Sequence, residues 1–592
     1  MTADEGRGPV TAQDQREPGW WRSAVVYQIY PRSFADSDGD GIGDVRGIIG
    51  RLDYLAALGV DVLWLSPIYR SPQDDNGYDI SDYDDIDPLF GSMADAEELI
   101  EQVHARGMKL VMDLVVNHTS DEHPWFLESR SSRDNPKRDW YWWRAARPGF
   151  EPGAPGAEPT DWESIFSGPA WAYDERTGEY FLHLFTRRQP DLNWENPEVR
   201  REVYAMMRRW LDRGVDGFRM DVINMISKAI RPDGSLPDAT DELAVLGGGA
   251  SSFFLNGPRI HEFLGEMHRE VLAGRNLITV GEMPGASPED AVLYTDPDRG
   301  EVDMVFTFEH MELDVAPSTG PSALGGKWNL APLRLVDLKA NLAGWQEGLA
   351  EVGWNSLYWN NHDQPRIVSR WGDDGEQRVP SAKSFGTVLH LMRGTPYVYQ
   401  GEELGMTNAH LTSLDGYRDV ETVNWAAGAA SRGIDEAAIL HSLSVKSRDN
   451  ARTPMQWTAD EHAGFTTGTP WLAVNPNHVE INAEAALADP GSVFHHYRRL
   501  IELRHTLPVA VDGSFRLLLP DDEQVFAYVR ELDGARLLVV ANLSGSPAQV
   551  DLGGDADLLA GELLLGTHGA PDAQAEGSVE LAPWESRVLL SE

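Results

Sequence analysis

The sequence contains no cysteine, so disulfide bonds and thiolate metal sites are excluded, and a reducing cytoplasm is a compatible location. It also lacks any run of 18 uninterrupted apolar residues, and residues 1–20 have none of the apolar character that a secretory signal needs. We therefore expect a cytoplasmic protein that contacts no membrane, with a disordered lead over residues 1–18.

Basic residues are scarce as well. The 592 residues include 50 Lys and Arg against 94 Asp and Glu, which gives a formal net charge of -44. Such a charge opposes contact with nucleic acid and anionic lipid, so a neutral or cationic partner is favoured. Because 42% of the residues are hydrophobic, the chain can bury a large core, and its length predicts two or more domains.

Eight short runs of β-branched or aromatic residues alternate with amphipathic helical patterns. The runs cover residues 25–30, 60–66, 109–118, 215–222, 276–282, 303–309, 356–363 and 395–403. Repeated strand–helix units of this kind place parallel strands in one sheet. Eight of them predict an α/β fold built on a (β/α)8 TIM barrel.

Interruptions of the repeat predict further domains. The barrel is expected to span residues 19–118 and 189–508, with an excursion at about 404–460. Residues 119–188, after the third strand, are far longer than an ordinary loop and predict an inserted small domain. Residues 509–592 alternate apolar and polar residues between turn signals, which predicts a C-terminal antiparallel β-sandwich domain.

Polar residues gather at the carboxyl ends of the predicted strands, where chemistry belongs in such a barrel. These residues are Asn117, His118, Arg219, Asp221, Glu282, Asn361, His362 and Asp363. A single carboxylate or histidine near a strand end is often only structural. Several like charges on one rim are unfavourable unless a function or a metal offsets them, so the set predicts an active site.

Several motifs around these residues resemble a known family. The stretches DLVVNH (113–118), GFRMDVIN (217–224), GEMPG (281–285) and NNHD (360–363) resemble the signature regions of the α-amylase family, glycoside hydrolase family 13. Five more stretches resemble its oligo-1,6-glucosidase and α-glucosidase branch: DSDGDGIGD (36–44), DDNGYDISDY (74–83), QPDLNW (189–194), GTPYVYQGEELGM (394–406) and RDNARTPMQW (448–457). The resemblance covers nearly the whole chain from Trp20 onward.

The resemblance implies catalytic roles for three carboxyl groups. Asp221 would be the nucleophile that forms a β-glycosyl-enzyme, Glu282 the general acid and then base, and Asp363 a stabiliser of the transition state. A retaining glycosidase needs two carboxyl groups about 5 to 5.5 Å apart, one ionised and one protonated. Arg219 lies on the same strand face as Asp221 and is expected to keep it ionised, while nearby carboxylates are expected to raise the pKa of Glu282.

The resemblance also implies a sugar pocket lined by imidazole and aromatic side chains. His118 and His362 would hydrogen-bond hydroxyl groups of the sugar, and Tyr78 would stack on its ring. A buried core tyrosine is the alternative for Tyr78. Phe166 and Phe185 match aromatic residues that line the same pocket.

Asp75 and Arg452 match two residues that form an ion pair at the floor of the pocket in this branch. A closed floor leaves room for one sugar unit beyond the scissile bond. We therefore expect single glucose units to be released from the non-reducing end. An ordinary surface ion pair is the alternative for these two residues.

The stretch DSDGDGIGD has the alternating oxygen-ligand spacing of a calcium loop. The resemblance implies that Ca²⁺ or Mg²⁺ binds the side chains of Asp36, Asp38, Asp40 and Asp44 and the carbonyl of Ile42, in a structural role. The twelfth position of the loop is Gly47, where an EF-hand requires a glutamate, so this is not an EF-hand. A solvated acidic turn is the alternative. No organic cofactor is expected.

The residue after the nucleophile bears on linkage. In the branch that the motifs resemble, valine at this position accompanies activity on α-1,6 bonds, and this chain has Val222. The expected substrate is therefore a small α-glucoside of the isomaltose type. Sucrose, maltose and transglucosylation stay open, because all of them share the same glucosyl-enzyme. No oligomeric state is predicted.

Two other readings fit the same motifs. A trehalose synthase or sucrose isomerase would rearrange a disaccharide through the same intermediate and release no free glucose. A catalytically inactive, transporter-associated relative would carry a transmembrane helix and lose the catalytic acids. This sequence keeps Asp221, Glu282 and Asp363 and has no long apolar run, which disfavours the inactive reading.

Overall fold

The eight predicted strands form a closed parallel barrel in a computed structural model of the chain, which describes residues 19–240, 249–317, 324–568 and 578–592. Neighbouring strands are parallel throughout, and a bridge between Val305 and Asn355 joins the first strand of the sheet to the last. In sheet order the strands are β11 (Met304–Phe306), β10 (Ile278–Glu282), β9 (Gly217–Asp221), β5 (Lys109–Val115), β2 (Val62–Leu65), β1 (Val26–Ile29), β13 (Thr395–Tyr399) and β12 (Ser356–Leu357). The predicted barrel is therefore confirmed, while the predicted disordered lead, residues 1–18, lies outside the described residues.

Helices follow the barrel strands along the chain. The longer ones are α2 (Leu52–Leu58), α3 (Met93–Ala105), α5 (Pro197–Arg213), α7 (Ile260–Met267), α8 (Pro288–Thr295), α9 (Leu335–Gly348), α11 (Arg378–His390) and α16 (Val493–Thr506). Helix α5 shows why they form: Asn196 caps its first turn, Pro197 opens it, and Gly214 ends it with φ 109°. Short helices are α1 (Val45–Ile49), α4 (Pro124–Ser129), α10 (Ile367–Arg370), α15 (Ala483–Ala488) and α17 (Pro508–Asp512).

Strand β9 carries two of the predicted site residues and is buried along its whole length. At its start a Cβ on Gly217 would lie 1.8 Å from the carbonyl oxygen of Ile278, so only glycine allows β9 and β10 to pair at this point. Successive strand residues point to opposite faces, so Arg219 and Asp221 share one face while Phe218 and Met220 take the other. The pairing thus brings Arg219 and Asp221 beside Glu282 at the end of β10.

The segment inserted after β5 forms a small antiparallel sheet. Its strands, in the order β6-β8-β7, are Trp143–Arg144, Glu179–Leu182 and Trp171–Asp174. Aromatic residues of this segment, among them Trp162 and Phe166, pack in a core of their own that also reaches Val222. A fully buried lysine, Lys228, ties the segment to the barrel, because its Nζ lies 2.7 Å from Asp191 Oδ2 and donates to Asn117 Oδ1 at 2.8 Å.

Two further pieces complete the rim of the barrel. A hairpin of β3 (Tyr69–Arg70) and β4 (Asp82–Ile86) brackets the loop that carries Asp75 and Tyr78. The excursion after β13 forms three helices, α12 (Val420–Ser431), α13 (Glu436–Lys446) and α14 (Asp449–Arg452).

These helices have a separate apolar core, in which Trp328 and Trp425 stack with their ring centroids 4.4 Å apart and an interplanar angle of 18°. The excursion is therefore an ordered wall rather than a loose loop.

The C-terminal part is an antiparallel β domain, as predicted. Its main sheet has the order β14 (Ser514–Leu518), β15 (Val525–Leu532), β16 (Ala535–Asn542), β20 (Ser586–Ser591) and β18 (Glu562–Gly566). A second pair, β17 (Ala548–Asp551) with β19 (Ser578–Leu581), packs on one face of this sheet through Val540, Val550 and Leu581. The other face meets α11 of the barrel, where the Tyr528 hydroxyl donates to the carbonyl of Val388 at 2.8 Å.

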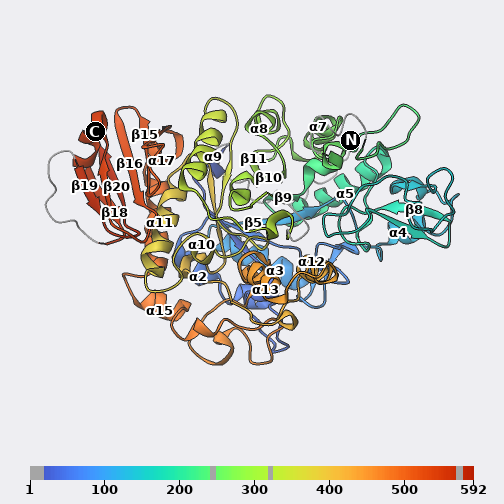
Figure 1. The fold of residues 1–592 in the computed structure, drawn as a ribbon, viewed down its shortest axis with the longest axis horizontal. Coiled ribbons are helices and arrows are strands. Elements are labelled where there is room, and N and C mark those ends of the chain that lie inside the picture. Colours follow the sequence, from blue (N-terminus) through green and yellow to red (C-terminus); the bar gives the residue numbers. More distant parts are fainter. Residues whose placement is uncertain (1–18, 241–248, 318–323, 569–577) are drawn as a thin grey trace, which may run out of the picture.

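The barrel lies at the centre of the molecule. Figure 1 shows the inserted segment around β8 and the C-terminal domain around β20 at opposite ends of its long axis. Among the helices of the described residues, none is long and apolar enough to cross a membrane.

Candidate active site

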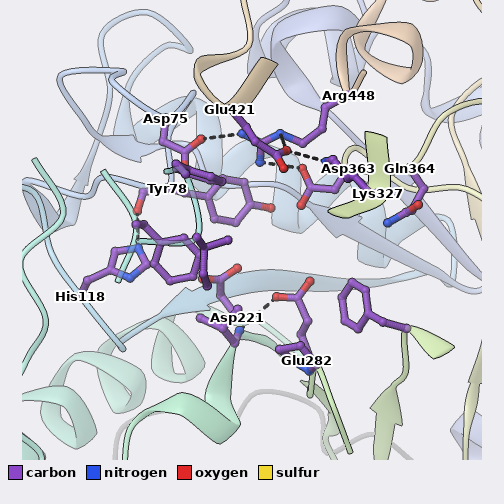
Figure 2. Close-up of a pocket in the computed structure, with 16 residues that line it drawn as sticks. Asp75, Tyr78, His118, Asp221, Glu282, Lys327, Asp363, Gln364, Glu421 and Arg448 are labelled. Carbon is purple, nitrogen blue, oxygen red and sulfur yellow. Dashed lines mark hydrogen bonds and ion pairs between the residues drawn. The ribbon is translucent and has the colours of Figure 1, made fainter. Parts of the chain in front are cut away.

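One arginine joins the carboxyl groups at the centre of the barrel mouth. Arg219 donates from Nη1 to Asp221 Oδ1 and to Asp113 Oδ1, both at 2.6 Å, and it pairs through Nη2 with Glu282. A single guanidinium group thus holds Asp221 and Glu282 side by side, as Figure 2 shows for the two carboxyl groups. Two carboxyl groups held side by side are the arrangement that a retaining glycosidase needs.

Burial sets the proton affinities of these two groups. It raises the pKa of Asp221 to about 7, because desolvation outweighs the opposing charge of Arg219. It raises the pKa of Glu282 further, to about 8, and the charges of Asp221 and Asp363 act in the same direction.

The raised pKa of Glu282 agrees with the sequence prediction. Arg219 acts on Asp221 in the predicted direction, because its charge and its hydrogen bond lower that pKa, but burial outweighs them. Asp221 nevertheless stays the more acidic of the two groups.

Val222 has an unusual backbone at the point where the chain leaves β9. Its φ of 35° and ψ of 41° lie in the left-handed region, which a β-branched residue rarely adopts and which costs about 1 to 3 kcal/mol. In this conformation its backbone N–H donates to Glu282 Oε2 at 3.0 Å. The residue after Asp221 therefore holds the second carboxyl group in place through its main chain.

Asp363 is bound by two arginines. Arg452 Nη2 donates to its Oδ1 at 2.7 Å and Arg448 Nη1 donates to the same oxygen at 3.1 Å. Burial alone would raise the pKa of Asp363, but these positive charges bring it below its usual range. His362, whose pKa burial lowers to about 3, is neutral, so the arginines carry this effect. Asp363 is the carboxylate of the site that stays firmly ionised.

The predicted ion pair between Asp75 and Arg452 is wrong. Asp75 Oδ1 instead accepts from Arg448 Nη2 at 3.3 Å, whereas Arg452 contacts the carbonyl of His362 and the carboxylates of Asp363 and Asp419. Arg448 and Arg452 are four residues apart, so they lie on one side of the α14 turn, and the sequence does not distinguish which reaches Asp75. The floor itself exists, because Arg448 bridges Asp75 and Asp363 as Figure 2 shows.

The two histidines are neutral and oriented. Burial lowers the pKa of His118 to about 4 and that of His362 to about 3. His118 Nε2 lies 3.1 Å from the carbonyl of Tyr78 and therefore carries the proton. Gln28 Nε2 donates to His362 Nδ1 at 2.8 Å, which leaves the proton on Nε2, the nitrogen 3.3 Å from Asp363.

Tyr78 lies flat against His362, with ring centroids 5.1 Å apart and an interplanar angle of 5°. Its hydroxyl donates to Asp113 Oδ2 at 3.1 Å, so the ring is fixed at the side of the cavity. The predicted Phe185 packs on His118, and Phe166 packs on Phe185 and on the guanidinium of Arg448. Both phenylalanines line the cavity, as predicted.

The residues surround a cavity of about 210 Å³ at the barrel mouth. Predicted residues that line it are Asp75, Tyr78, His118, Phe166, Phe185, Asp221, Val222, Glu282 and Asp363. Arg219, His362 and Arg452 stand behind this lining and act on it through the contacts given above.

Sequence reasoning missed several residues that line the cavity. They are Ile165, Pro284, Phe308, Lys327, Gln364, Glu421 and Arg448. Lys327 Nζ donates to Glu421 Oε2 at 2.6 Å, although the two residues are 94 positions apart. Asp113 was also missed, although it lies two residues before Val115 on the inward alternation of its strand and so could have been found.

The predicted metal loop brings three carboxylates together. Asp36, Asp38 and Asp40 each offer an oxygen, and these oxygens all lie within 4.8 Å of one another, which suits a hard divalent cation. Asp44 stands apart from this group, because its side chain caps α1 and accepts from the Gly47 N–H at 2.7 Å. Ile42 follows in the same loop and donates its N–H to Asp40 at 2.8 Å.

Comparison with known proteins places this geometry among related enzymes. Residues 28–513 match the alpha amylase catalytic domain, and residues 515–588 match the maltogenic amylase C-terminal domain. The chain is 56% identical over 570 residues to an oligo-1,6-glucosidase from Parageobacillus thermoglucosidasius, which covers 96% of this chain and 98% of that protein.

Two solved structures superpose on nearly the whole chain. A trehalose-6-phosphate hydrolase from Bacillus licheniformis has a TM-score of 0.89 and 48% identity, covering 97% of this chain and 100% of its own. An isomaltulose synthase from Klebsiella has a TM-score of 0.90 and 40% identity, with the same coverage.

Proposed function

We propose that this chain, which belongs to the α-amylase family of glycoside hydrolases, is an α-glucosidase that releases single glucose units from short α-1,6-linked glucosides. One observation carries the proposal. Arg448 bridges Asp75 and Asp363 and closes the cavity behind the paired carboxyl groups Asp221 and Glu282. A closed floor admits one terminal sugar and excludes the interior of a long chain.

The two carboxyl groups divide the reaction between them. Asp221 attacks the anomeric carbon of the terminal glucose while Glu282 gives its proton to the departing glycosidic oxygen, which yields a β-glucosyl-enzyme and a free alcohol. Glu282 then accepts a proton from water, which attacks the same carbon and displaces Asp221 with net retention of configuration. The higher pKa of Glu282 suits it to be the group that starts protonated.

Asp363 and the neutral histidines serve the bound sugar. The firmly ionised Asp363, backed by Arg448 and Arg452, suits binding of sugar hydroxyl groups and stabilisation of positive charge at the anomeric carbon. His362 holds its proton on Nε2 and directs it towards Asp363, whereas the Nε2 proton of His118, which lines the cavity, is donated to the Tyr78 carbonyl. The contacts of these groups with the sugar would strengthen as the glucose ring flattens towards the oxocarbenium-like transition state.

The α-1,6 preference rests on Val222 and on the oligo-1,6-glucosidase relative. Rates on isomaltose, maltose, sucrose and longer isomalto-oligosaccharides test linkage and chain length together. We expect the highest kcat/KM on isomaltose, free α-glucose as first product, and little hydrolysis inside polymers. Efficient internal cleavage of starch, or a preference for maltose, would contradict the proposal.

A disaccharide-rearranging activity is the second candidate, favoured by the structural similarity to an isomaltulose synthase. Both activities pass through the same glucosyl-enzyme and differ in whether water or the released sugar attacks it. Product analysis separates them. Accumulation of a new disaccharide from sucrose or maltose, without matching free glucose, would favour rearrangement over hydrolysis.

The loop of Asp36, Asp38 and Asp40 would hold a structural Ca²⁺ or Mg²⁺. The loop follows β1 and contributes no residue to the cavity lining, so the ion would act on stability. A chelator should lower Tm by about 2 to 5 °C while the Asp38→Asn variant shows no further loss. Equal chelator effects on both proteins would reject the site.

A cytoplasmic location is proposed as well, supported by the absence of cysteine.

A further inference from the structure

The segment 358–366, which carries Asp363, lies between strand β12 and helix α10 and belongs to neither. A strand is positioned by backbone hydrogen bonds to its neighbours, whereas this segment depends largely on its side chains. The Tyr358 hydroxyl, for example, donates to the carbonyl of Thr307 at 2.7 Å. The position of Asp363 is therefore set by side-chain contacts with parts of the barrel that do not line the cavity.

Asn360 is a side chain of this segment whose amide is bound through both its nitrogen and its oxygen. Its Nδ2 donates to Glu402 Oε2 at 2.5 Å, and its Oδ1 accepts from the backbone N–H of Ile367 at 2.5 Å. Because the N–H of Ile367 can only donate, the amide oxygen must face it and the amide nitrogen must face Glu402. Asn360 and Glu402 are both buried, so their contact is shielded from water.

Glu402 is anchored in turn to the outer ring of the barrel. It begins the short helix η9 (Glu402–Leu404), shortly after β13. Its Oε1 accepts from the hydroxyl of Tyr497, a buried residue of α16, at 2.9 Å. Burial raises the pKa of Glu402 to about 7, while the hydrogen bonds from Tyr497 and Asn360 act against this rise. The carboxyl group thus joins helix α16 to the segment 358–366 through two neutral donors.

The next residue along the chain is a second buried glutamate with different partners. Glu403 Oε1 accepts from the hydroxyls of Tyr27 at 2.9 Å and Tyr54 at 2.7 Å, which belong to β1 and α2. Within the described residues, no hydrogen bond joins the Glu403 side chain to the segment 358–366. Two adjacent glutamates of equal chemistry therefore hold different parts of the barrel, and Glu402 alone of the two holds the segment of Asp363.

We propose that Glu402 is a positioning residue for Asp363: it holds Asn360, and through Asn360 the segment 358–366, where Asp363 can meet the glucose ring. This role rests on the proposed α-glucosidase function and adds to it a residue outside the cavity lining. Asp363 follows Asn360 by three residues, so a shift of Asn360 passes along the main chain to Asp363. Misplacement of a substrate-binding group by about 1 Å can cost on the order of 100-fold in rate.

Exchange of the two polar groups tests the proposal. Glu402→Gln keeps an oxygen for the Tyr497 hydroxyl but turns an amide nitrogen towards the nitrogen of Asn360, so that contact is lost. We expect kcat/KM to fall by roughly 10- to 100-fold, equally on isomaltose and on p-nitrophenyl α-glucoside, because both present the same terminal glucose. Asn360→Asp, which brings two buried carboxyl groups together, should show a similar loss. The double variant Glu402→Gln/Asn360→Asp restores the hydrogen bond with donor and acceptor exchanged, and should recover most of the activity.

Glu403→Gln is the matched control, because it makes the same change in the adjacent buried residue. It should lower Tm as Glu402→Gln does but keep kcat/KM within about threefold of wild type, since its partners lie away from the segment 358–366. In an Asp363→Asn enzyme, Glu402→Gln should cost less than about threefold more, because the residue that it positions is already changed.

Equal losses of kcat/KM in Glu402→Gln and Glu403→Gln would overturn the proposal. So would a double variant Glu402→Gln/Asn360→Asp that regains the wild-type Tm while its kcat/KM stays at the level of the single variants. A wild-type enzyme that cleaves neither substrate would instead refute the proposed function.

Discussion

The two sides of the cavity are built differently. The floor is a network of buried charges in which Arg219, Arg448 and Arg452 each bind two or more carboxylates. The rest of the lining has the ion pair of Lys327 with Glu421 and apolar residues such as Val222 and Ile165. Ile165 is 47% exposed, whereas Arg219 and Arg452 are 1% exposed.

This difference separates what is fixed from what can vary. A buried network fails when one partner is removed, because the remaining charges are left uncompensated. A partly exposed wall tolerates substitution at a smaller cost in stability. The floor is therefore suited to recognise one invariant glucose, and the wall to adjust the leaving group. The relatives named for different reactions, an oligo-1,6-glucosidase and an isomaltulose synthase, fit this division.

The largest effects should come from the two carboxyl groups at the boundary between the sides. Asp221→Asn removes the nucleophile and should lower kcat on isomaltose by about 10⁴-fold or more. Glu282→Gln removes the proton donor and should lower it by about 10² to 10⁴-fold. Circular dichroism should show the fold intact in both variants. Turnover within tenfold of wild type in either variant would refute the assigned roles.

Removal of Arg448 should come next, since it leaves Asp75 buried without its ion-pair partner. Arg448→Met is expected to lower kcat/KM by roughly 100-fold or more. A double-mutant cycle tests the corrected pairing directly. Asp75→Asn combined with Arg448→Met should show a coupling energy of about 1 to 3 kcal/mol. The matched cycle of Asp75→Asn with Arg452→Met should give a coupling energy below about 0.5 kcal/mol. A larger coupling of Asp75 to Arg452 than to Arg448 would support the pairing that the sequence predicted.

The difference between the two sides also explains what the sequence could predict. Asp221, Arg219 and Glu282 were found because strand alternation fixes the direction of a side chain once the strand is known. The partner of Asp75 was assigned wrongly because Arg448 and Arg452 share one helical face.

Lys327 and Glu421 were missed because they are 94 residues apart in the sequence, and only the three-dimensional fold joins them. The run 356–363 was predicted as one strand, but β12 ends at Leu357. Beyond it Asn360 uses its side chain to bind the Ile367 N–H and the carboxylate of Glu402. Local propensity yields to such side-chain contacts, which a single sequence does not reveal.

The charge network should also define the pH profile. Activity needs Asp221 ionised and Glu282 protonated, and burial raises their pKa values to about 7 and about 8. As pH falls Asp221 gains a proton and stops attacking, and as pH rises Glu282 loses the proton it must donate. We expect a narrow bell in kcat/KM with a slope of about tenfold per pH unit on each side. Because both groups share Arg219, the two limbs report the pair and not single residues.

The smallest change should come from the wall, at Val222. Val222→Thr keeps the β-branched shape and the left-handed backbone, so the N–H to Glu282 should remain and stability should change by less than about 1 kcal/mol. The added hydroxyl meets only the leaving sugar. It should shift the ratio of kcat/KM for isomaltose over maltose towards maltose by roughly 5- to 10-fold.

Hydrolysis of p-nitrophenyl α-glucoside, whose leaving group has no sugar hydroxyls, is the control for this variant and should stay within about twofold of wild type. If both rates fall together, Val222 acts mainly through its backbone on Glu282, and linkage is decided elsewhere on the wall. An unchanged ratio with unchanged rates would remove Val222 from the linkage argument and leave Lys327, Glu421 and Phe308 as the residues to test.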